Sequence, residues 1–485
     1  MNDQSPPAQG AGPELEPDGP PAKRLVAGDW QGIAGALLVA ATCAVIVGEF
    51  GFRQQAGNIA AMLVTGFALL QLRRLSFSVL ILAAAGLAFL VFGFSTRSDM
   101  VLLIESVAVR SAWVVAVFVS LLSLRSAVND IPGIVRSGLY LVSQPPGRRY
   151  AALTLGSQLF SHILQYGAVT LLGGLVTNIT AREPDGWLRQ ARERRMLLAI
   201  QRGFVATLCW SPVAFPMIIS TAVVPGSDWI GSVPGALGTS VLIMGIGWFL
   251  DSLFKPQMAA TRPMAVLGAA KDLLPLALLL GALFAGAAAI VLTTGMSTSV
   301  AVLIMVPFMA LVIVLVRAGG SGSRRVAAAG SWIRQFAREE LPLFSSESML
   351  VIAATFTGLL SVELLGPVIQ TVALPAMPGW LVLVLVVWWM PAAGQVGLHP
   401  ILAASLVGGL FPQPALYGLT PDQLVVAITG GWALSGATSP FTAVTALVAR
   451  LGRVSAYTVG WRWNGLFLLC TGIAVSLWAA FNPVS

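Results

Sequence analysis

The sequence predicts an all-α, polytopic integral membrane protein with about 12 to 14 transmembrane helical elements, arranged as two inverted-topology repeats with broken helices. Three observations predict this class. Of 485 residues, 56% are hydrophobic and 10% are charged, and the mean hydropathy of +0.84 exceeds that of ordinary soluble domains. Apolar runs of about 17 to 25 residues recur, each long enough to cross about 30 Å of hydrocarbon as a helix. A pattern that ends in Ser-Pro occurs twice, at 203–212 and 431–440.

The first 125 residues divide into a polar tail and a block of four predicted helices. Residues 1–28 are rich in Pro, Gly and acidic side chains, a composition typical of disordered segments. Lys23 and Arg24 indicate a cytoplasmic N-terminus, because cytoplasmic flanks of membrane spans carry an excess of basic residues. We expect the block at 29–125 to hold transmembrane helices near 30–50, 57–72, 75–95 and 101–123.

The first repeat half is expected at 126–316. Its 131–144 segment is either a short interfacial helix or a short crossing, and the apolar run 150–176 is either a re-entrant hairpin or a span. Basic residues flank this run on both sides, so both flanks favour the cytoplasm. Glycines that allow a turn or close packing favour the hairpin, namely Gly156, Gly167, Gly173 and Gly174. Further spans are predicted near 203–224, 230–250, 273–294 and 298–316.

The second repeat half is expected at 317–485, with apolar runs near 343–366, 368–392, 396–412, 424–448 and 464–481. Two polar segments, 187–195 and 332–340, share a Trp followed by Arg, Gln and Glu. Each is predicted to form an amphipathic helix that lies in the membrane interface. The alternative to a repeat is convergence, since any helix on the cytoplasmic surface favours such residues.

The Ser-Pro pattern predicts two interrupted helices. Both copies read Gly, an aromatic residue, six small or apolar residues and then Ser-Pro, which is Ser211-Pro212 in the first copy and Ser439-Pro440 in the second. Proline donates no backbone hydrogen bond and clashes with the preceding turn, so each helix breaks there. Inside a membrane, broken backbone is tolerated only where protein or a polar cavity covers it. Paired broken helices in two halves of a chain are typical of the central site of a transporter.

The charges around the two copies predict that the repeats are inverted. The first copy follows a basic segment that ends at Arg202, so its helix starts on the cytoplasmic side. The second copy is followed by Arg450 and Arg453, so its helix starts outside. One motif that runs through the membrane in opposite directions is the arrangement that alternating-access transporters use.

Hydroxyl groups gather around both predicted breaks. An interrupted helix leaves N–H groups unpaired on one side, which suit a carboxylate, and C=O groups unpaired on the other, which suit Na⁺. The alternative is that the hydroxyls satisfy these backbone groups and bind no ligand. The predicted substrate-binding residues are Thr207, Ser211, Pro212, Ser435, Thr438, Ser439 and Pro440.

Three titratable residues are candidates for coupling transport to a proton or an ion. The two histidines, His162 and His399, each precede a Gly-Gly pair and titrate near neutral pH, although His399 before Pro400 could equally start a helix with a hydrogen bond. Glu363 lies in an apolar run, where an ionisable group is costly and by default functional, unless it lies close enough to the span end to be solvated.

Two further acidic groups have structural interpretations. Glu105 and Arg110 share a predicted span but are five residues apart, a poor distance for pairing on a helix. Glu347 follows two serines and is predicted to stabilise a helix start, where an acid favours the N-terminal dipole.

Several function classes lack a signature in the sequence. We find no Walker loop, no zinc-protease motif and no nucleophile elbow, so we predict no enzyme activity. The net charge of +8 reflects arginines in short loops between apolar runs, so we expect no nucleic-acid partner. Two histidines and the scattered Cys43, Cys209 and Cys470 predict no metal site. No cofactor is expected beyond a coupling proton or Na⁺.

The chain resembles the ion-transporter superfamily, which includes dicarboxylate, citrate and arsenite permeases and the large subunits of TRAP-type carriers. The Gly-Leu-His-Pro-Ile run at 397–401 and the two Ser-Pro sites carry the resemblance, which extends over about 150–450. It lacks the Asn-rich hairpin tips of those families. The resemblance implies a small organic anion as substrate.

We therefore expect an ion-coupled secondary transporter of a small organic anion in the bacterial inner membrane. The alternative is a non-transporting scaffold or an assembly component of cell-envelope biogenesis. The expected partners are the lipid bilayer and the anionic substrate, with a homodimer as an option.

Overall fold

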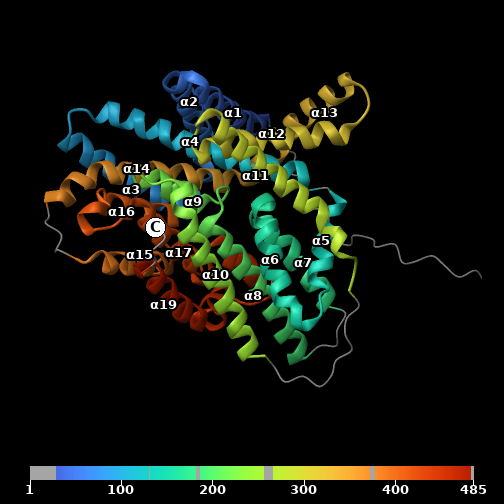
Figure 1. Ribbon diagram of the computed structural model, residues 1–485. Helices are drawn as coiled ribbons and strands as arrows, with labels where there is room; N and C mark the ends of the chain where they lie inside the picture. The colour runs from blue at the N-terminus through green and yellow to red at the C-terminus, as the bar shows by residue number, and fades with distance from the viewer. Residues whose placement is uncertain (1–28, 130, 182–185, 256–265, 372–376, 482–485) are drawn as a thin grey trace, which may run out of the picture.

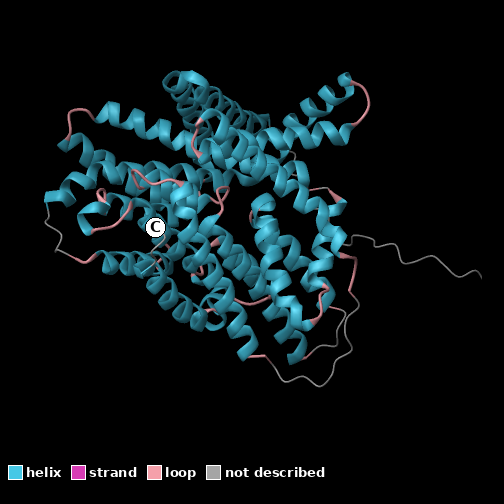
Figure 2. Cartoon of the chain, in the orientation of Figure 1, coloured by secondary structure: helices cyan, strands magenta, loops and turns pink. Residues whose placement is uncertain are grey.

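The computed structural model describes residues 29–129, 131–181, 186–255, 266–371 and 377–481. Within these residues every regular element is helical and no strand occurs (Figure 2). The tail at 1–28 that we predicted to be disordered lies outside the described residues.

Nineteen α-helices form the described chain, joined in places by short 3₁₀ and π turns. The first ten are α1 Asp29–Val47, α2 Arg53–Gln71, α3 Phe77–Thr96, α4 Met100–Val128, α5 Pro132–Val142, α6 Pro146–Leu164, α7 Tyr166–Thr180, α8 Trp187–Trp210, α9 Phe215–Val223 and α10 Trp229–Leu253. The others are α11 Leu274–Thr294, α12 Thr298–Ala318, α13 Gly322–Gln335, α14 Ser345–Thr371, α15 Gly379–Gln395, α16 Pro400–Leu410, α17 Pro421–Thr438, α18 Ala443–Leu451 and α19 Gly465–Phe481.

The helices are long and apolar enough for a multi-pass membrane protein. Among the described residues, nine helical segments have the length and composition to cross a membrane, and four shorter helices are also apolar. The predicted class, an all-α polytopic membrane protein, is therefore confirmed.

The N-terminal helices pack on one another and on two later helices. A turn at Gly48–Phe52, where Gly51 adopts a φ of 124°, reverses the chain between α1 and α2. Both helices pack against α4, whereas α3 packs against α14 (Figure 1). Helix α4 also contacts α12 and α14, so it joins the N-terminal block to the rest of the molecule.

We predicted that the amphipathic segment 187–195 forms a helix of its own in the membrane interface. This prediction is wrong, because the segment is the first part of α8. No proline or glycine lies between Trp187 and Arg202, so the helix continues without a break. The Arg195 guanidinium also forms an ion pair of 2.6 Å with Asp251 of α10. The related segment 332–340 ends α13 and continues through a π turn at Phe336–Glu340. Glu347 lies in the first turn of α14, as predicted.

The run 150–176 forms two helices that pack on each other as a hairpin, which agrees with the favoured prediction. Helices α6 and α7 meet at Gln165, whose φ of 51° is left-handed and reverses the chain. A second hairpin, which we did not predict, is formed by α15 and α16 around Gly397, with a φ of 81°.

The two hairpins begin two units with the same order of elements. In the first unit α6 and α7 precede the interrupted helix α8/α9 and the long helix α10, and in the second α15 and α16 precede α17/α18 and α19. In each unit the first hairpin helix packs against the interrupted helix. The segment after each break packs on the hairpin of the other unit, α9 on α16 and α18 on α7.

Helices α8 and α17 bring the two units together in the centre of the molecule (Figure 1). The Gln201 amide of α8 lies 3.2 Å from the Ala437 carbonyl of α17. Further along α8, the Cys209 sulfur lies 3.9 Å from the Thr429 carbonyl. Residue numbers rise along one helix as they fall along the other, so α8 and α17 run antiparallel.

Candidate functional site

Both Ser-Pro sequences interrupt a helix, as predicted. Helix α8 ends at Trp210 and α9 starts at Phe215, while α17 ends at Thr438 and α18 starts at Ala443. The backbone leaves the helix identically in the two copies, because Ser211 adopts φ −68°, ψ 128° and Ser439 adopts φ −71°, ψ 128°. Pro212 and Pro440, which follow these serines, are both buried.

The serine hydroxyls at the breaks bond to backbone groups. The Ser211 hydroxyl accepts a hydrogen bond of 3.3 Å from the Val213 N–H, and the Ser439 hydroxyl accepts one of 3.2 Å from the Phe441 N–H. Ser439 also donates to the Gly394 carbonyl at 2.7 Å, near the end of α15. Each hydroxyl thus replaces the carbonyl acceptor that an N–H group loses where the helix is interrupted, which supports the structural alternative for these two residues.

The threonines before the breaks serve their own helices. Thr207 donates to the Gly203 carbonyl at 3.1 Å, and Thr438 donates to the Leu434 carbonyl at 2.7 Å. Ser435 differs, because its hydroxyl is fully buried and has no hydrogen-bond partner within the described part of the chain. A role of these residues in substrate binding stays a prediction.

Side chains from other parts of the chain donate hydrogen bonds to the carbonyls at the break in α17. The Ala437 carbonyl accepts hydrogen bonds from Gln201 at 3.2 Å and Asn464 at 3.1 Å. The Gly436 carbonyl accepts from the hydroxyls of Thr442 and Thr445 at 3.1 and 3.0 Å. Because protein donors occupy these oxygens, they are poorly placed to bind Na⁺.

A buried arginine continues this polar network. The Arg202 guanidinium is 4% exposed and donates to the Asn464 side-chain oxygen at 3.3 Å and to the Gly247 carbonyl at 3.2 Å. Its carbon lies 4.4 Å from the centre of the Phe467 ring, a cation–π distance. Sequence reasoning missed this network, although the Gln-Arg pair at 201–202 inside an apolar region was a signal.

The glycines that open the Ser-Pro pattern are explained by close packing. A Cβ on Gly203 would overlap the Thr154 carbonyl of α6, and a Cβ on Gly431 would lie 2.6 Å from the Val387 carbonyl of α15. In both units the interrupted helix therefore approaches the backbone of the first hairpin helix at the same position of the pattern. Only glycine allows this approach.

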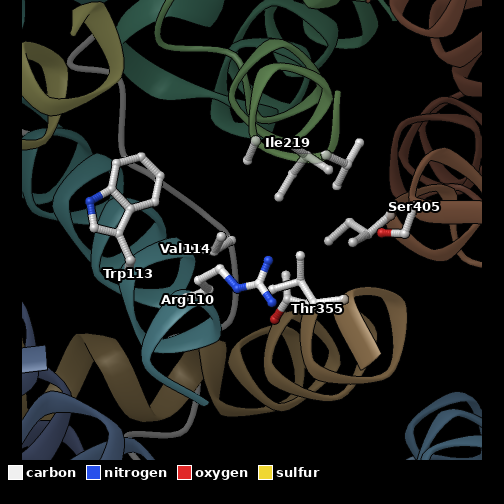
Figure 3. A pocket seen from close by; sticks show the side chains of 10 residues that line it. Arg110, Trp113, Val114, Ile219, Thr355 and Ser405 are labelled. Atoms are coloured by element: carbon white, nitrogen blue, oxygen red, sulfur yellow. The ribbon is translucent and has the colours of Figure 1, made fainter. Parts of the chain in front are cut away.

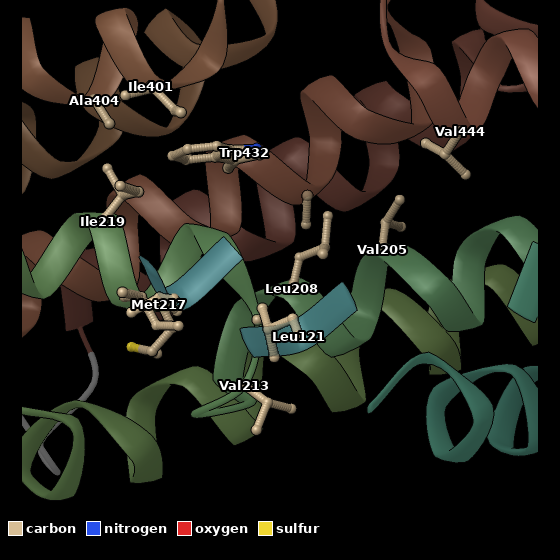
Figure 4. Packing of buried hydrophobic residues seen from close by; sticks show 14 of the residues in the cluster. Leu121, Val205, Leu208, Val213, Met217, Ile219, Ile401, Ala404, Trp432 and Val444 are labelled. Carbon is tan, nitrogen blue, oxygen red and sulfur yellow. The ribbon is translucent and has the colours of Figure 1, made fainter. Parts of the chain in front are cut away.

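Apolar side chains fill the space between the interrupted helices. Figure 4 shows Val205 and Leu208 of α8 facing α17, with Trp432 nearby, and all three are buried. A Cβ on Gly436 of α17 would lie 3.2 Å from Val205 and 3.7 Å from Leu208. The first helical segments of the two units are thus in direct contact in this conformation.

His162 lies at the first hairpin, beside the first break. Its Nδ1 atom is 2.7 Å from the Gln158 carbonyl, so Nδ1 carries the proton of the neutral ring. The Nε2 atom is buried without a partner among the described residues. The ring centre lies 5.2 Å from that of Trp210, the last residue of α8, and 5.3 Å from that of Phe284.

His399 occupies the second hairpin but has a different bonding pattern. It precedes the first turn of α16, and its Nδ1 atom accepts a hydrogen bond of 3.3 Å from the Ile401 N–H. The helix-start role that we considered for His399 is therefore confirmed, and a coupling role for it stays a prediction.

Glu363 pairs with a residue far away in sequence. The Arg110 guanidinium of α4 lies 2.7 Å from the Glu363 carboxylate of α14. Glu105, which we had considered beside Arg110, instead accepts a hydrogen bond of 2.7 Å from Asn58. The candidate coupling residues thus lie in different places, His162 beside a break and Glu363 against the N-terminal block.

The arrangement of the described titratable residues does not form a cation centre of the usual kind. Within the part of the chain that the structure describes, no group of three or more His, Cys, Asp and Glu side chains could hold a metal ion.

Solved structures place this architecture among transporters. The chain is similar to the YdaH transporter of Alcanivorax borkumensis, with a TM-score of 0.58 and 15% identity over 84% of this chain and 100% of that one. It is also similar to MtrF of Neisseria gonorrhoeae, which represents a class of antimetabolite efflux pumps, with a TM-score of 0.51 and 13% identity over 84% and 95% of the two chains. The chain has the fold of these two transporters.

At this identity the likeness shows the fold alone. No family model and no curated protein sequence matches the chain. The transporter fold that the sequence resemblance implied is therefore supported, while membership of the permease families named above stays a prediction. Both similar structures are transporters, not enzymes.

One mutant pair tests the structural assignment of the hydroxyls. Ser439→Ala should lower the free energy of unfolding by about 1 to 3 kcal/mol, because it removes the hydrogen bond to the Gly394 carbonyl and leaves the Phe441 N–H without its side-chain acceptor. Ser435→Ala should cost less, because the hydroxyl that it removes has no partner in the described chain. Thermal unfolding of the two purified variants measures this difference, and an equal loss in both would refute the assignment.

Proposed function

We propose that this protein is a secondary transporter that moves a small organic anion across the bacterial inner membrane by alternating access, coupled to protons. The supporting observation is the doubled arrangement of a hairpin, an interrupted helix and a long helix, with the two interrupted helices in antiparallel contact. Inverted units with broken helices that meet at the centre of the bilayer are the usual basis of alternating access.

The exchange of contacts between units supports a concerted movement. Helices α9 and α18 are each tied to α8 or α17 through a short break, yet they pack on the hairpin of the opposite unit. A rotation at one break therefore shifts the hairpin of the other unit.

His162 is the proton carrier in this proposal. Its Nε2 atom is available to accept a proton, while Nδ1 stays bonded to the Gln158 carbonyl. Protonation places a charge beside Trp210, at the end of α8, and so favours one conformation of the first break. Protons are preferred over Na⁺ because the carbonyls at the second break already have protein donors.

A flux assay tests the proposal. Purified protein in sealed vesicles, with a pH-sensitive dye inside, is exposed to a panel of carboxylates. We expect one or more of them to change the internal pH faster than in protein-free vesicles. A folded protein that moves neither protons nor any carboxylate would refute the proposal and favour a non-transporting scaffold.

A pair of histidine variants tests the coupling step in the same vesicles. His162→Asn keeps a donor for the Gln158 carbonyl but removes the titratable nitrogen, so we expect proton movement to fall at least tenfold. His399→Asn, the matched control, keeps an acceptor for the Ile401 N–H and should retain proton movement. Loss in the control alone would assign coupling to His399 instead.

A further inference from the structure

A cavity away from the two breaks contains an arginine in the middle of a membrane helix. It has a volume of about 110 Å³ and lies among α4, α9, α14 and α16 (Figure 3). Arg110 is the tenth residue after Met100 at the start of α4, so it lies about 15 Å along that helix. A charged side chain at such depth is costly and in general has a function.

Among the described residues, Arg110 is the sole charged one that lines this cavity, and the remaining walls are mainly apolar. Its side chain extends from α4 into the space between Thr355 of α14 and Ile219 of α9 (Figure 3). The other lining residues are Trp113, Val114, Ala222, Val223, Leu359, Ile401 and Ser405. One cationic end and an apolar body fit a ligand with one negative charge and a hydrocarbon part.

Two polar groups remain available to such a ligand. Among the described residues Arg110 makes one ion pair, from Nη2 to Glu363, and its side chain is 45% exposed, so further guanidinium donors face the cavity. The Ser405 hydroxyl is 1% exposed, has no partner in the described chain and points into the cavity (Figure 3). An unpaired buried hydroxyl is costly, which a bound carboxylate would relieve.

A larger cavity adjoins this one. It has a volume of about 740 Å³ and shares Arg110, Trp113 and Ala222 with the smaller cavity. Its lining includes residues of three helix connections, at 48–53, 227–230 and 295–300. The charge pattern of the sequence places these connections on the outer side of the membrane.

The cavity also borders parts that the proposed transport cycle would move. Ile219 lies in α9, directly after the first break, and Ile401 lies in α16, directly after the turn of the second hairpin. Arg110 comes from α4, which belongs to the N-terminal block, and Thr355 comes from α14, which packs on that block. Movement of α9 and α16 against α4 and α14 would therefore open or close the cavity.

We propose that this cavity is the substrate site and that it binds an amphipathic monocarboxylate, with the carboxylate on Arg110 and Ser405 and the hydrocarbon part against α9 and α16. This proposal rests on the proposed function and names the substrate class. Glu363 competes with the ligand for Arg110, so it sets the affinity.

Calorimetric titration of the purified full-length protein with cyclohexanecarboxylate tests the site. We expect saturable binding, and no binding of the neutral analogue cyclohexylmethanol. Arg110→Gln should weaken carboxylate binding at least tenfold, whereas Glu363→Gln should strengthen it because Arg110 loses its competing anion. Arg195→Gln is the matched control, since Arg195 pairs with Asp251 and lines neither cavity, and it should bind like the wild type.

Each contrary outcome identifies what fails. Absence of binding in the wild type, or unchanged binding in Arg110→Gln, overturns the site. The variants with opposite expected signs separate a site effect from misfolding, because Glu363→Gln breaks the same ion pair. If vesicles show carboxylate flux but the titration shows no binding at Arg110, the proposed function stands and only the site is wrong. If the site binds the carboxylate but no flux occurs, only transport is refuted.

Discussion

Gly203→Ala should destabilise the protein by about 3 kcal/mol, at the upper end of the usual cost of overpacking. The added Cβ would overlap the backbone carbonyl of Thr154, which cannot move without displacing α6. Gly431→Ala should behave similarly, because its Cβ would lie 2.6 Å from the Val387 carbonyl. Thermal unfolding in detergent measures both losses.

Gly174→Ala is the control for these two variants. Gly174 also lies inside a helix, α7, but no atom lies within 4 Å of its added Cβ. Alanine favours a helix by about 1 kcal/mol over glycine, so this variant should be neutral or stabilised. If Gly203→Ala matched this control, the close approach of α6 and α8 would be wrong.

Asn464→Leu should lower the free energy of unfolding by about 3 kcal/mol, because it leaves a buried guanidinium with fewer acceptors. Asn464 is fully buried and accepts two hydrogen bonds of 3.3 Å from Arg202. It also donates to the Gln201 side chain at 3.0 Å and to the Ala437 carbonyl at 3.1 Å. The substitution keeps the branched shape of the side chain but removes every one of these bonds.

Asn464→Leu should also weaken the contact between the two repeated units. Gln201 and Arg202 belong to α8, and Ala437 belongs to α17, so Asn464 connects both interrupted helices. The exposed Asn129 provides a control, since Asn129→Leu should change stability by less than about 0.5 kcal/mol. Equal unfolding temperatures for the two variants would show that the network contributes little.

Local backbone rules made the two breaks predictable. Pro212 and Pro440 each remove a backbone donor, and the repeated Ser-Pro pattern indicated the two interruptions. Proline alone is not sufficient, because Pro234 and Pro307 lie inside continuous helices. The first hairpin followed from basic flanks on both sides of one apolar run. The second hairpin was missed because 368–392 and 396–412 each resemble an ordinary span, and only the structure shows that the chain reverses at Gly397.

Contacts between distant residues were not predictable. Arg110 and Glu363 are 253 positions apart, and nothing in the local pattern of either helix indicates the other. The same holds for Gln201 and Asn464, which are 263 positions apart. The cavity around Arg110 depends on how distant helices pack, so the sequence did not predict it. The hydroxyls at the breaks were visible in the sequence, but they bond mainly to the backbone.

The most direct test of this account is the orientation of the two units in the membrane. Equivalent positions follow the second segment of each interrupted helix, Pro225 after α9 and Ser455 after α18, and both are exposed. Single cysteines are introduced there in a background that lacks Cys43, Cys209 and Cys470. A maleimide that cannot cross membranes is then applied to intact cells.

Inverted units predict opposite results at the two positions. The Pro225→Cys variant should be labelled in intact cells, whereas the Ser455→Cys variant should be labelled only after the membrane is permeabilised. Labelling of both variants from the same side would contradict the inversion and, with it, the alternating-access mechanism.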